Sequence, residues 1–408
     1  MPAALFPTHL ISTIIHRHST SPQPAYPHDD RTTAQRVWPT LHDPGGTQID
    51  IQPCPTPDER TQDRHFIADW QLPNGLWRFR AVFDGHGGHE TVDLTVRDVP
   101  TAIHDALVAI VTEQAQPEPS VISDLLRDTV AGVDAKIGEE FLALFPGGAD
   151  AVEKMTEEEI VAIINDDGPN NLKTVRCMRG STVLVSLVSP DLDVWVASLG
   201  DCPALLGVKD ASGDWTAKIM GANHNGVDAA EAARVRSEHP GEDETCILRD
   251  RVLGALAVTR AMGDFEFKLP GVYTAKVFLK SNPGFRITSK VEEFLPRNLT
   301  PPYVSAICDV QHVNVKALGA TGAYLLVASD GLVDLSGDEY GMDHREPENF
   351  SKKWVEILAR PEATGNRALY LLRDAMGQTA AKVSSLLTVE SETRWMDDTT
   401  VIYTSLIE

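Results

Sequence analysis

The sequence predicts an α+β fold in which antiparallel strands form sheets and helices cover them. Two pairs of alternating apolar segments are each separated by a tight-turn sequence, a pattern typical of β-hairpins. Helical periodicity occupies the stretch between these hairpins, so the helices are most simply a layer packed on a sheet. With 408 residues, of which 42% are hydrophobic, the chain has enough apolar material for one large globular domain or two ordinary ones.

The first hairpin is predicted from the segments His65–Leu72 and Leu76–Phe83, with a turn at residues 73–75. The turn contains Asn-Gly, which is a strong hairpin signal between alternating apolar runs. Folding the chain back there places Asp63 within about two positions of the residue opposite Asp84, and paired residues lie ~5 Å apart. The hairpin therefore brings two carboxylates together at one edge of a sheet.

Helices are predicted in the stretch that follows. Pro100 suits a first helical turn before the apolar residues of Ala102–Val111. A second helix is expected to start at a cap on Ser120 and to run to about residue 145, where Pro-Gly-Gly follows. Thr156–Glu159 has the form of a capping box before Ile160–Ile164.

The second hairpin is predicted from Ser181–Val188 and Asp193–Leu199, which flank a Ser-Pro-Asp turn. Folding there puts Asp201 opposite the start of the first of these strands. A further strand, Tyr324–Ser329, leads into Asp-Gly, and a last strand is expected at Thr399–Ile407.

Aspartates stand at the ends of the predicted strands, and in an antiparallel sheet some strand starts share an edge with other strand ends. They are Asp63, Asp84, Asp201, Asp330 and Asp397. Carboxylates a few ångströms apart repel by kcal/mol even at an effective dielectric of ~20, so a cluster requires protonation or bound cations. The ligands are nearly all oxygens, which favours Mg²⁺ or Mn²⁺ over zinc. Two such ions can activate a bridging water and hold a phosphoryl group.

His86 belongs to the turn predicted at Asp84–Gly88, where the strand Leu76–Phe83 is expected to end. Glycines there admit positive φ and let a ligand approach the backbone closely. Beside a metal ligand, the imidazole is placed to protonate a leaving oxygen. An ordinary polar turn is the alternative interpretation of the same residues.

Charge and composition argue against several partners. The chain has 36 Lys and Arg against 59 Asp and Glu, a net charge of −23, which disfavours nucleic acid or an anionic membrane as a partner. No apolar run approaches the ~20 residues that span a bilayer. The five cysteines form no CxxC pair, which favours a reducing, intracellular compartment. Residues 1–44 are expected to be a disordered or targeting tail, and residues 45–408 one domain.

Seven short motifs follow one another along the chain: Gln62-Asp63-Arg64, Asp84–Gly88, Gly180-Ser181-Thr182, Gly200-Asp201, Thr259–Asp264, Ser329-Asp330-Gly331 and Asp397–Val401. Each motif alone is common, but the set in this order resembles the metal-dependent serine/threonine protein phosphatases of the 2C type (PPM family). Four more segments resemble the pyruvate dehydrogenase phosphatase branch of that family: His224-Asn225-Gly226, Glu238-His239-Pro240, Asp250–Gly254 and Thr300–Tyr303.

The resemblance implies a β-sandwich of two antiparallel sheets between helical layers (α-β-β-α), with an inserted flap at Phe265–Leu299 that governs substrate choice. It implies Mg²⁺- or Mn²⁺-dependent hydrolysis of phosphoserine and phosphothreonine in proteins, with pyruvate dehydrogenase as a candidate substrate. Two ions would be held by Asp63, Asp84, the Gly85 carbonyl, Asp330 and Asp397, and a third, weaker ion by Asp201, Asp330 and Asp334. The candidate substrate-binding residues are Arg60 and Arg260. A monomer in the mitochondrion or cytoplasm is expected.

The chain departs from the family at three places. Gln62 replaces a usual Glu, Cys202-Pro203 replaces a common Ser-Arg, and Asp58 replaces a phosphate-gripping Arg that the dehydrogenase phosphatase branch also lacks. The first two leave open a pseudophosphatase that binds partners without catalysis. A metal-dependent nuclease is the third interpretation, disfavoured by the net charge and by the absence of an evident basic stripe in the sequence.

Overall fold

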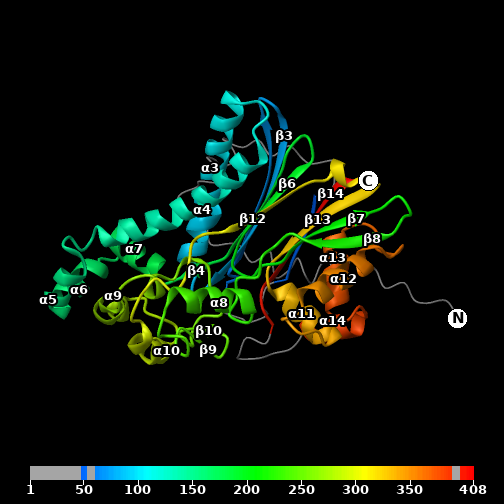
Figure 1. Ribbon diagram of the computed structural model, residues 1–408. Helices are drawn as coiled ribbons and strands as arrows, with labels where there is room; N and C mark the ends of the chain where they lie inside the picture. The colour runs from blue at the N-terminus through cyan, green and yellow to red at the C-terminus, as the bar shows by residue number, and fades with distance from the viewer. Residues whose placement is uncertain (1–46, 53–59, 388–395) are drawn as a thin grey trace.

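The computed structural model describes residues 47–52, 60–387 and 396–408. Its strands form two antiparallel sheets that face each other, and helices cover both outer faces (Figure 1). The predicted α-β-β-α sandwich is therefore confirmed. The expected N-terminal tail and Asp58 lie outside the described residues. Each described helix is too short or too polar to cross a membrane.

The larger sheet has seven strands in the order β11-β4-β3-β5-β6-β12, with β2 also paired to β3. Their bounds are β2 (Asp63–Leu72), β3 (Gly75–His86), β4 (Gly180–Ser181), β5 (Val183–Val188), β6 (Asp193–Leu199), β11 (Met262–Gly263) and β12 (Asp309–Asn314). Both predicted hairpins are confirmed as the antiparallel pairs β2–β3 and β5–β6. In the first, Asp63 pairs directly with Asp84.

Two details of the first hairpin differ from expectation. The turn is shorter, because Gly75 already pairs with Leu72 and has a φ of 129°, a value suited to glycine. The strand β3 also runs on through His86 and does not end at Phe83. It continues because Gly85 and His86 pair with the short strand β4, a partner from far along the chain that local sequence does not reveal.

The smaller sheet has five strands in the order β1-β14-β13-β7-β8. Their bounds are β1 (Thr47–Gln52), β7 (Ala204–Lys209), β8 (Trp215–Ile219), β13 (Gly322–Ala328) and β14 (Thr399–Ile407). The last strand has the predicted bounds, and β13 starts two residues before the predicted segment. A separate two-stranded ribbon joins β9 (Ile247–Leu248) and β10 (Arg251–Val252).

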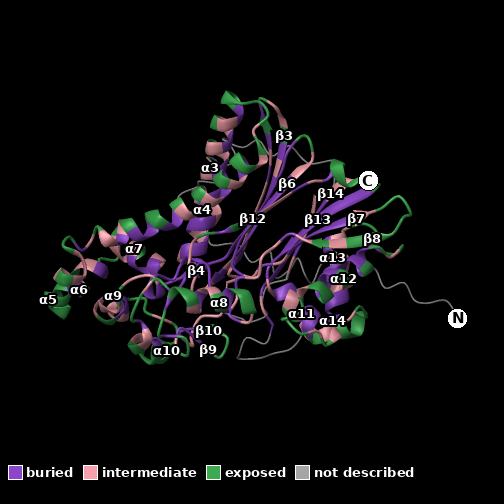
Figure 2. Cartoon of the chain, viewed as in Figure 1, coloured by how far each residue is buried: buried purple, intermediate pink, exposed green. Residues whose placement is uncertain are grey.

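Alternating side chains on the central strands build separate cores on the two faces of each sheet. Val82 and Leu184 of the larger sheet pack with Leu325 and Ile402 of the smaller one, which fills the space between the sheets. The neighbouring residues point the other way, toward the helices, as the two-residue period of a strand requires. In Figure 2 the central strands are accordingly buried, whereas the outer helix faces are exposed.

One helical layer packs on the larger sheet: α3 (Glu90–Glu113), α4 (Pro119–Leu142), α5 (Gly148–Lys154), α6 (Glu157–Ile164) and α7 (Pro169–Cys177). Pro100 was expected in a first turn but lies inside α3, where its burial with Ile103 against the sheet offsets the missing N–H. Ser120 was expected as a cap, yet α4 starts at Pro119 with Glu118 as the N-cap residue. The capping box at Thr156 and Glu159 is confirmed.

The other layer covers the smaller sheet with α11 (Gly331–Tyr340), α12 (Pro347–Leu358), α13 (Arg367–Ala375) and α14 (Ala380–Leu387). A long connection between β8 and β12 carries α8 (Ala229–Glu238), η1 (Phe265–Phe267), α9 (Gly271–Lys276), η2 (Phe278–Lys280), α10 (Thr288–Phe294) and η3 (Leu295–Arg297). A further 3₁₀ turn, η4 (Lys316–Leu318), follows β12. The expected flap, Phe265–Leu299, is therefore less loop-like than its Pro and Gly residues suggested. Buried aromatic residues explain this, because Phe265, Tyr273 and Phe278 belong to the core of the larger sheet.

Candidate active site

Carboxylates from both sheets meet at one edge of the sandwich. Asp63 opens β2, Asp330 follows β13, and Asp397 precedes β14. The hydroxyls of Ser329 and Thr400 both donate to Asp63 Oδ2 at 2.7 Å, so the edges of the two sheets are joined at this carboxylate. The convergence predicted from strand ends is thus present in the structure.

The electrostatics of this edge are those of crowded, buried acids. Burial raises the pKa of Asp63 to about 7, with a further contribution from the negative charge of Asp398. Burial likewise raises the pKa of Asp84 and of Asp330, with a further contribution from the negative charge of Asp330 to the first and of Asp201 to the second. The cluster is unfavourable as a set of bare anions.

The donor set fits a hard cation. Across the described ranges, no group of three or more His, Cys, Asp or Glu side chains is already arranged around a common ion position. Two carboxylate oxygens, Asp63 Oδ1 and Asp330 Oδ1, are nevertheless buried without a hydrogen-bond partner among the described residues. An oxygen in that state lacks compensation for its lost hydration, and a cation would supply it.

The Gly85 carbonyl belongs to the same edge. A Cβ at Gly85 would come within 2.8 Å of the Gln62 carbonyl oxygen, so the close approach of these two segments requires glycine. In the amide orientation that satisfies both neighbours, Gln62 donates to the Gly85 carbonyl at 3.1 Å and accepts from the Gly88 N–H at 3.3 Å. The uncharged residue at position 62 therefore supports the glycine-rich segment.

His86 stands beside the cluster at the end of β3. Its Nε2 lies 2.7 Å from Asp264 Oδ2. Burial by itself lowers the imidazole pKa, but the charge and hydrogen bond of Asp264, together with Asp201, outweigh it, so that the pKa of His86 is raised. Gly180 makes the contact possible, since a Cβ there would lie 1.9 Å from His86 Nε2. The sequence motif contained Asp264, but the pattern alone gave it no role.

A second acidic group extends from this point. Asp201 follows β6, and Asp334 lies one turn after Asp330 on α11. Burial raises the pKa of both Asp201 and Asp334. Asn225 Nδ2 donates to Asp201 Oδ2 at 2.7 Å and fixes that carboxylate, a contact that sequence reasoning missed.

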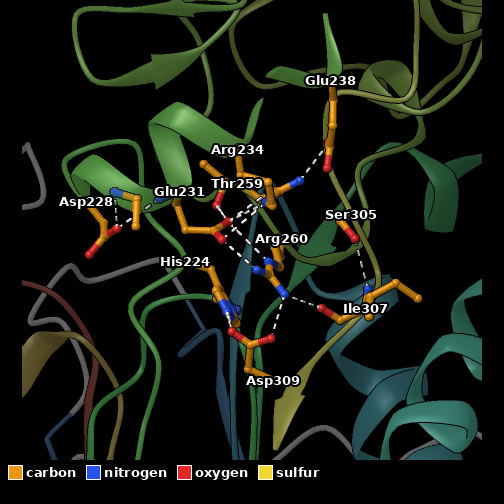
Figure 3. A network of polar contacts seen from close by, with 12 residues as sticks. His224, Asp228, Glu231, Arg234, Glu238, Thr259, Arg260, Ser305, Ile307 and Asp309 are labelled. Carbon is orange, nitrogen blue, oxygen red and sulfur yellow. Dashed lines mark hydrogen bonds and ion pairs between the residues drawn. The ribbon is translucent and has the colours of Figure 1, made fainter. Parts of the chain in front are cut away.

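Arg260 was predicted to bind substrate, and the structure places it elsewhere. Figure 3 shows its guanidinium bound to Glu231 at 2.5 Å and to Asp309 at 3.0 Å. Asp309 also contacts His224 Nε2 at 3.1 Å, and His224 Nδ1 accepts from the Gly200 N–H at 3.2 Å. This network holds the backbone beside Asp201, so Arg260 supports the site indirectly, through Asp309 and His224.

Arg60, the other predicted substrate-binding residue, is part-exposed and is paired with a carboxylate of the helical layer. Its two guanidinium nitrogens contact the carboxylate of Asp93 on α3 at 3.1 Å each. Arg64 contacts the same carboxylate at 2.8 Å. The pair of arginines therefore anchors the start of β2 to the helical layer.

Comparisons with known proteins show what the chain is similar to. Residues 143–345 match the family model described as "Protein phosphatase 2C". The chain is 26% identical over 405 residues to the mitochondrial pyruvate dehydrogenase phosphatase 2 of Homo sapiens, covering 83% of this chain and 74% of that protein. It is 25% identical over 393 residues to the protein phosphatase 2C homolog C10F6.17c of Schizosaccharomyces pombe, covering 89% and 81%.

A third relative is the mitochondrial pyruvate dehydrogenase phosphatase 1 of Homo sapiens, 28% identical over 271 residues. That match covers 57% of this chain and 50% of the relative. A solved structure of a C. elegans sex determining protein aligns over 97% of this chain and 81% of its own, with a TM-score of 0.48 and 17% identity.

The residues matched by the family model include only part of the candidate site, and the remaining site residues lie outside that range. Asp201, Asp264 and Asp330 lie inside residues 143–345, whereas His86 and Asp63 are brought to them by β2 and β3. The relatives extend the likeness over most of the chain. We conclude that the chain belongs to the protein phosphatase 2C family and is a protein serine/threonine phosphatase.

Proposed function

We propose that the protein hydrolyses phosphoserine and phosphothreonine with Mg²⁺ or Mn²⁺ held at the carboxylate edge. Two ions would be bound by Asp63, Asp84, the Gly85 carbonyl, Asp330 and Asp397, and a third by Asp201, Asp330 and Asp334. The observation that carries the proposal is the convergence of buried carboxylates from both sheets beside His86. When bound, the ions supply activation of water and positive charge for the phosphoryl oxygens.

The chain's own residues do the remaining work. His86 donates a proton to the seryl or threonyl oxygen as the bond to phosphorus breaks. Asp264 keeps the ring oriented and protonated by accepting at 2.7 Å, which the raised pKa of His86 reflects. Ser329 and Thr400 hold the Asp63 carboxylate in place, because both hydroxyls donate to the same one of its oxygens. His86 is thus the catalytic residue and Asp264 a positioning residue.

The proposed substrate is a phosphorylated protein of the pyruvate dehydrogenase type, and the proposed location is the mitochondrion. Support comes from two relatives named as phosphatases of that enzyme, at 26% and 28% identity. A tagged full-length chain, imaged with and without residues 1–40, tests the location. Turnover of phosphorylated pyruvate dehydrogenase, compared with an unrelated phosphoprotein, tests the substrate.

One assay tests the reaction itself against the alternatives. The purified chain is incubated with a phosphoserine peptide, a small aryl phosphate and DNA, each with Mn²⁺ or with excess chelator. Turnover of the two phosphomonoesters with Mn²⁺ alone is expected, and Asp84→Asn or Asp330→Asn abolishes it. Binding without turnover would indicate a pseudophosphatase, DNA cleavage would indicate a nuclease, and full turnover in chelator would overturn the metal proposal.

A further inference from the structure

A cavity of about 590 Å³ opens directly beside the carboxylate edge. It is lined by the segment that leads from β8 to α8 and by α11 and α12, which lie close together in Figure 1, and the end of β8 closes it. Asp201, Asp330 and Asp334 form its wall on the active-site side. The volume falls within the ~300–1,000 Å³ of sites that enclose small groups. A substrate that reaches the carboxylates therefore passes the mouth of this cavity.

The inner surface of the cavity is largely apolar. Phe350 and Trp354 of α12 line it, and both are buried. Trp354 Nε1 donates to Ser336 Oγ at 2.9 Å, so the indole N–H is satisfied and the ring presents carbon to the cavity. Val333 and Ile219 complete the apolar wall and are only half-buried. Such a surface binds aliphatic or aromatic groups by removing them from water.

The mouth of the cavity is acidic. Asp228, Asp343 and Glu348 line it beyond the three active-site aspartates, whose charge the proposed ions would neutralise. Arg345 there is already engaged, because it contacts Asp250 at 2.7 Å, and His344 lies 3.7 Å from Asp334. An anionic metabolite would be repelled, whereas a lysine or arginine beside an apolar group would be attracted.

From this combination we infer that the cavity seats an apolar side chain of the substrate next to the phosphorylated residue, with a basic residue at the acidic mouth. The inference rests on the proposed phosphatase activity and names the substrate class that this site prefers. The occupant is a segment of the phosphoprotein, because the cavity is continuous with the carboxylates to which its phosphate must go. The cavity thereby acts as a specificity pocket.

Three phosphoserine peptides test the pocket. The first carries Leu and Lys next to the phosphoserine, the second has Ser in place of Leu, and the third has Glu in place of Lys. With Mn²⁺, the first peptide is expected to have a kcat/KM at least about tenfold above the second, since burial of such a group is worth that much discrimination. Equal kcat/KM for all three peptides would refute the proposed role of the cavity as a specificity pocket and leave the phosphatase proposal intact. No turnover of any peptide would instead overturn the proposed function.

Two variants locate the effect. Ile219→Trp fills the pocket from β8 and is expected to bring the Leu-to-Ser ratio of kcat/KM to about one. Its matched control is Thr216→Trp on the same strand, which faces a separate cavity on the other side of α12 and is expected to keep the wild-type ratio.

Glu348→Lys, on the exposed first turn of α12, is expected to abolish or reverse the preference for Lys over Glu. An unchanged ratio in folded Ile219→Trp together with an unchanged preference in Glu348→Lys would refute the inference.

Discussion

The His86 ring illustrates, for a single residue, how position and protonation are set by the same contact. Asp264 holds Nε2 at 2.7 Å and raises the pKa of His86 above its usual range. Gly180 leaves the space in which that contact forms, and glycine is required there because any Cβ would collide with the ring. The proposed proton donor thus depends on three residues that lie far apart in the sequence.

Removal of the imidazole tests its role as an acid. A seryl oxygen is a poor leaving group and needs a proton, whereas a nitrophenolate leaves without one. His86→Ala is therefore expected to lower kcat for a phosphoserine peptide by ~10²–10⁴-fold at saturating Mn²⁺ and to slow an activated aryl phosphate much less. Asp264→Asn is the companion variant: it should move the alkaline fall of peptide kcat to lower pH, because it lowers the His86 pKa. Equal losses on both substrates would show that His86 acts in folding or metal binding.

Asn225 is a second residue whose importance only the structure reveals. Its side-chain amide donates to Asp201 at 2.7 Å and favours the ionised carboxylate. Asn225→Ala is expected to weaken Mn²⁺ binding at the Asp201 position by about 10–100-fold, the usual cost of losing a group that orients a ligand. Calorimetric titration with Mn²⁺ measures this without reference to activity. Asn223→Ala, two residues earlier, serves as the control, and similar losses in both variants would refute the assignment.

Among whole elements, much of the fold follows from local signals. The antiparallel pairing of both hairpins, the capping box at Thr156 and the last strand were predictable because turn residues and two-residue alternation act over short distances. The continuation of β3 to His86 and the partner Asp264 were not, since both depend on segments more than ninety residues away. The same holds for Arg260, whose motif indicated importance but whose carboxylate partners arise only from tertiary packing.

The inserted segment is an element whose packing only the structure reveals. Phe278 is fully buried in the core of the larger sheet, whereas Ile287 is 47% exposed. Phe278→Ala is expected to lower the free energy of unfolding by about 3–5 kcal/mol, the cost of a large buried cavity. Ile287→Ala is expected to change it by no more than about 0.5 kcal/mol. Urea denaturation measures both, and similar values would mean that the insert is a detachable loop.

The network in Figure 3 ties α8 to β12 and gives a stability that depends on pH. Burial alone would raise the pKa of Glu231, but hydrogen bonds from Arg260, Arg234 and Thr259 lower it to about 2. A lowered carboxylate pKa stabilises the fold above the unfolded value of ~4.5, and the stabilisation is lost as pH falls toward 2.

Glu231→Gln is therefore expected to cost about 2 kcal/mol at pH 7, since one pKa unit is worth ~1.4 kcal/mol and solvent screens part of the shift. The difference from wild type should narrow below pH ~4.5. Unfolding in urea at pH 7, 5 and 4 measures it. Glu238→Gln removes the exposed partner of Arg234 and should cost less than about 1 kcal/mol. A loss in Glu231→Gln that does not change with pH would contradict the linkage.

Considered as a whole, the molecule is two sheets joined at a carboxylate edge. Asp63 and Asp84 belong to the larger sheet, while Asp330 and Asp397 flank strands of the smaller one. Ions bound there would connect the sheets, and they would also offset the burial and the mutual repulsion that raise the pKa of these acids. Catalytic metal binding and the stability of the fold are consequently linked.

This linkage predicts opposite effects of one substitution with and without metal. At 100 times its dissociation constant, Mn²⁺ is expected to stabilise the wild type by about 2.7 kcal/mol and to raise its Tm by about 3 °C. Asp330→Asn should melt at or above the metal-free wild type, because it removes a buried negative charge, and should lose the Mn²⁺-dependent shift. Asp338→Asn, on the exposed side of the same helix, should behave like the wild type in both respects. Calorimetric melting curves decide the matter: an Mn²⁺ shift that persists in Asp330→Asn would mean that the ions do not bind where the two sheets meet.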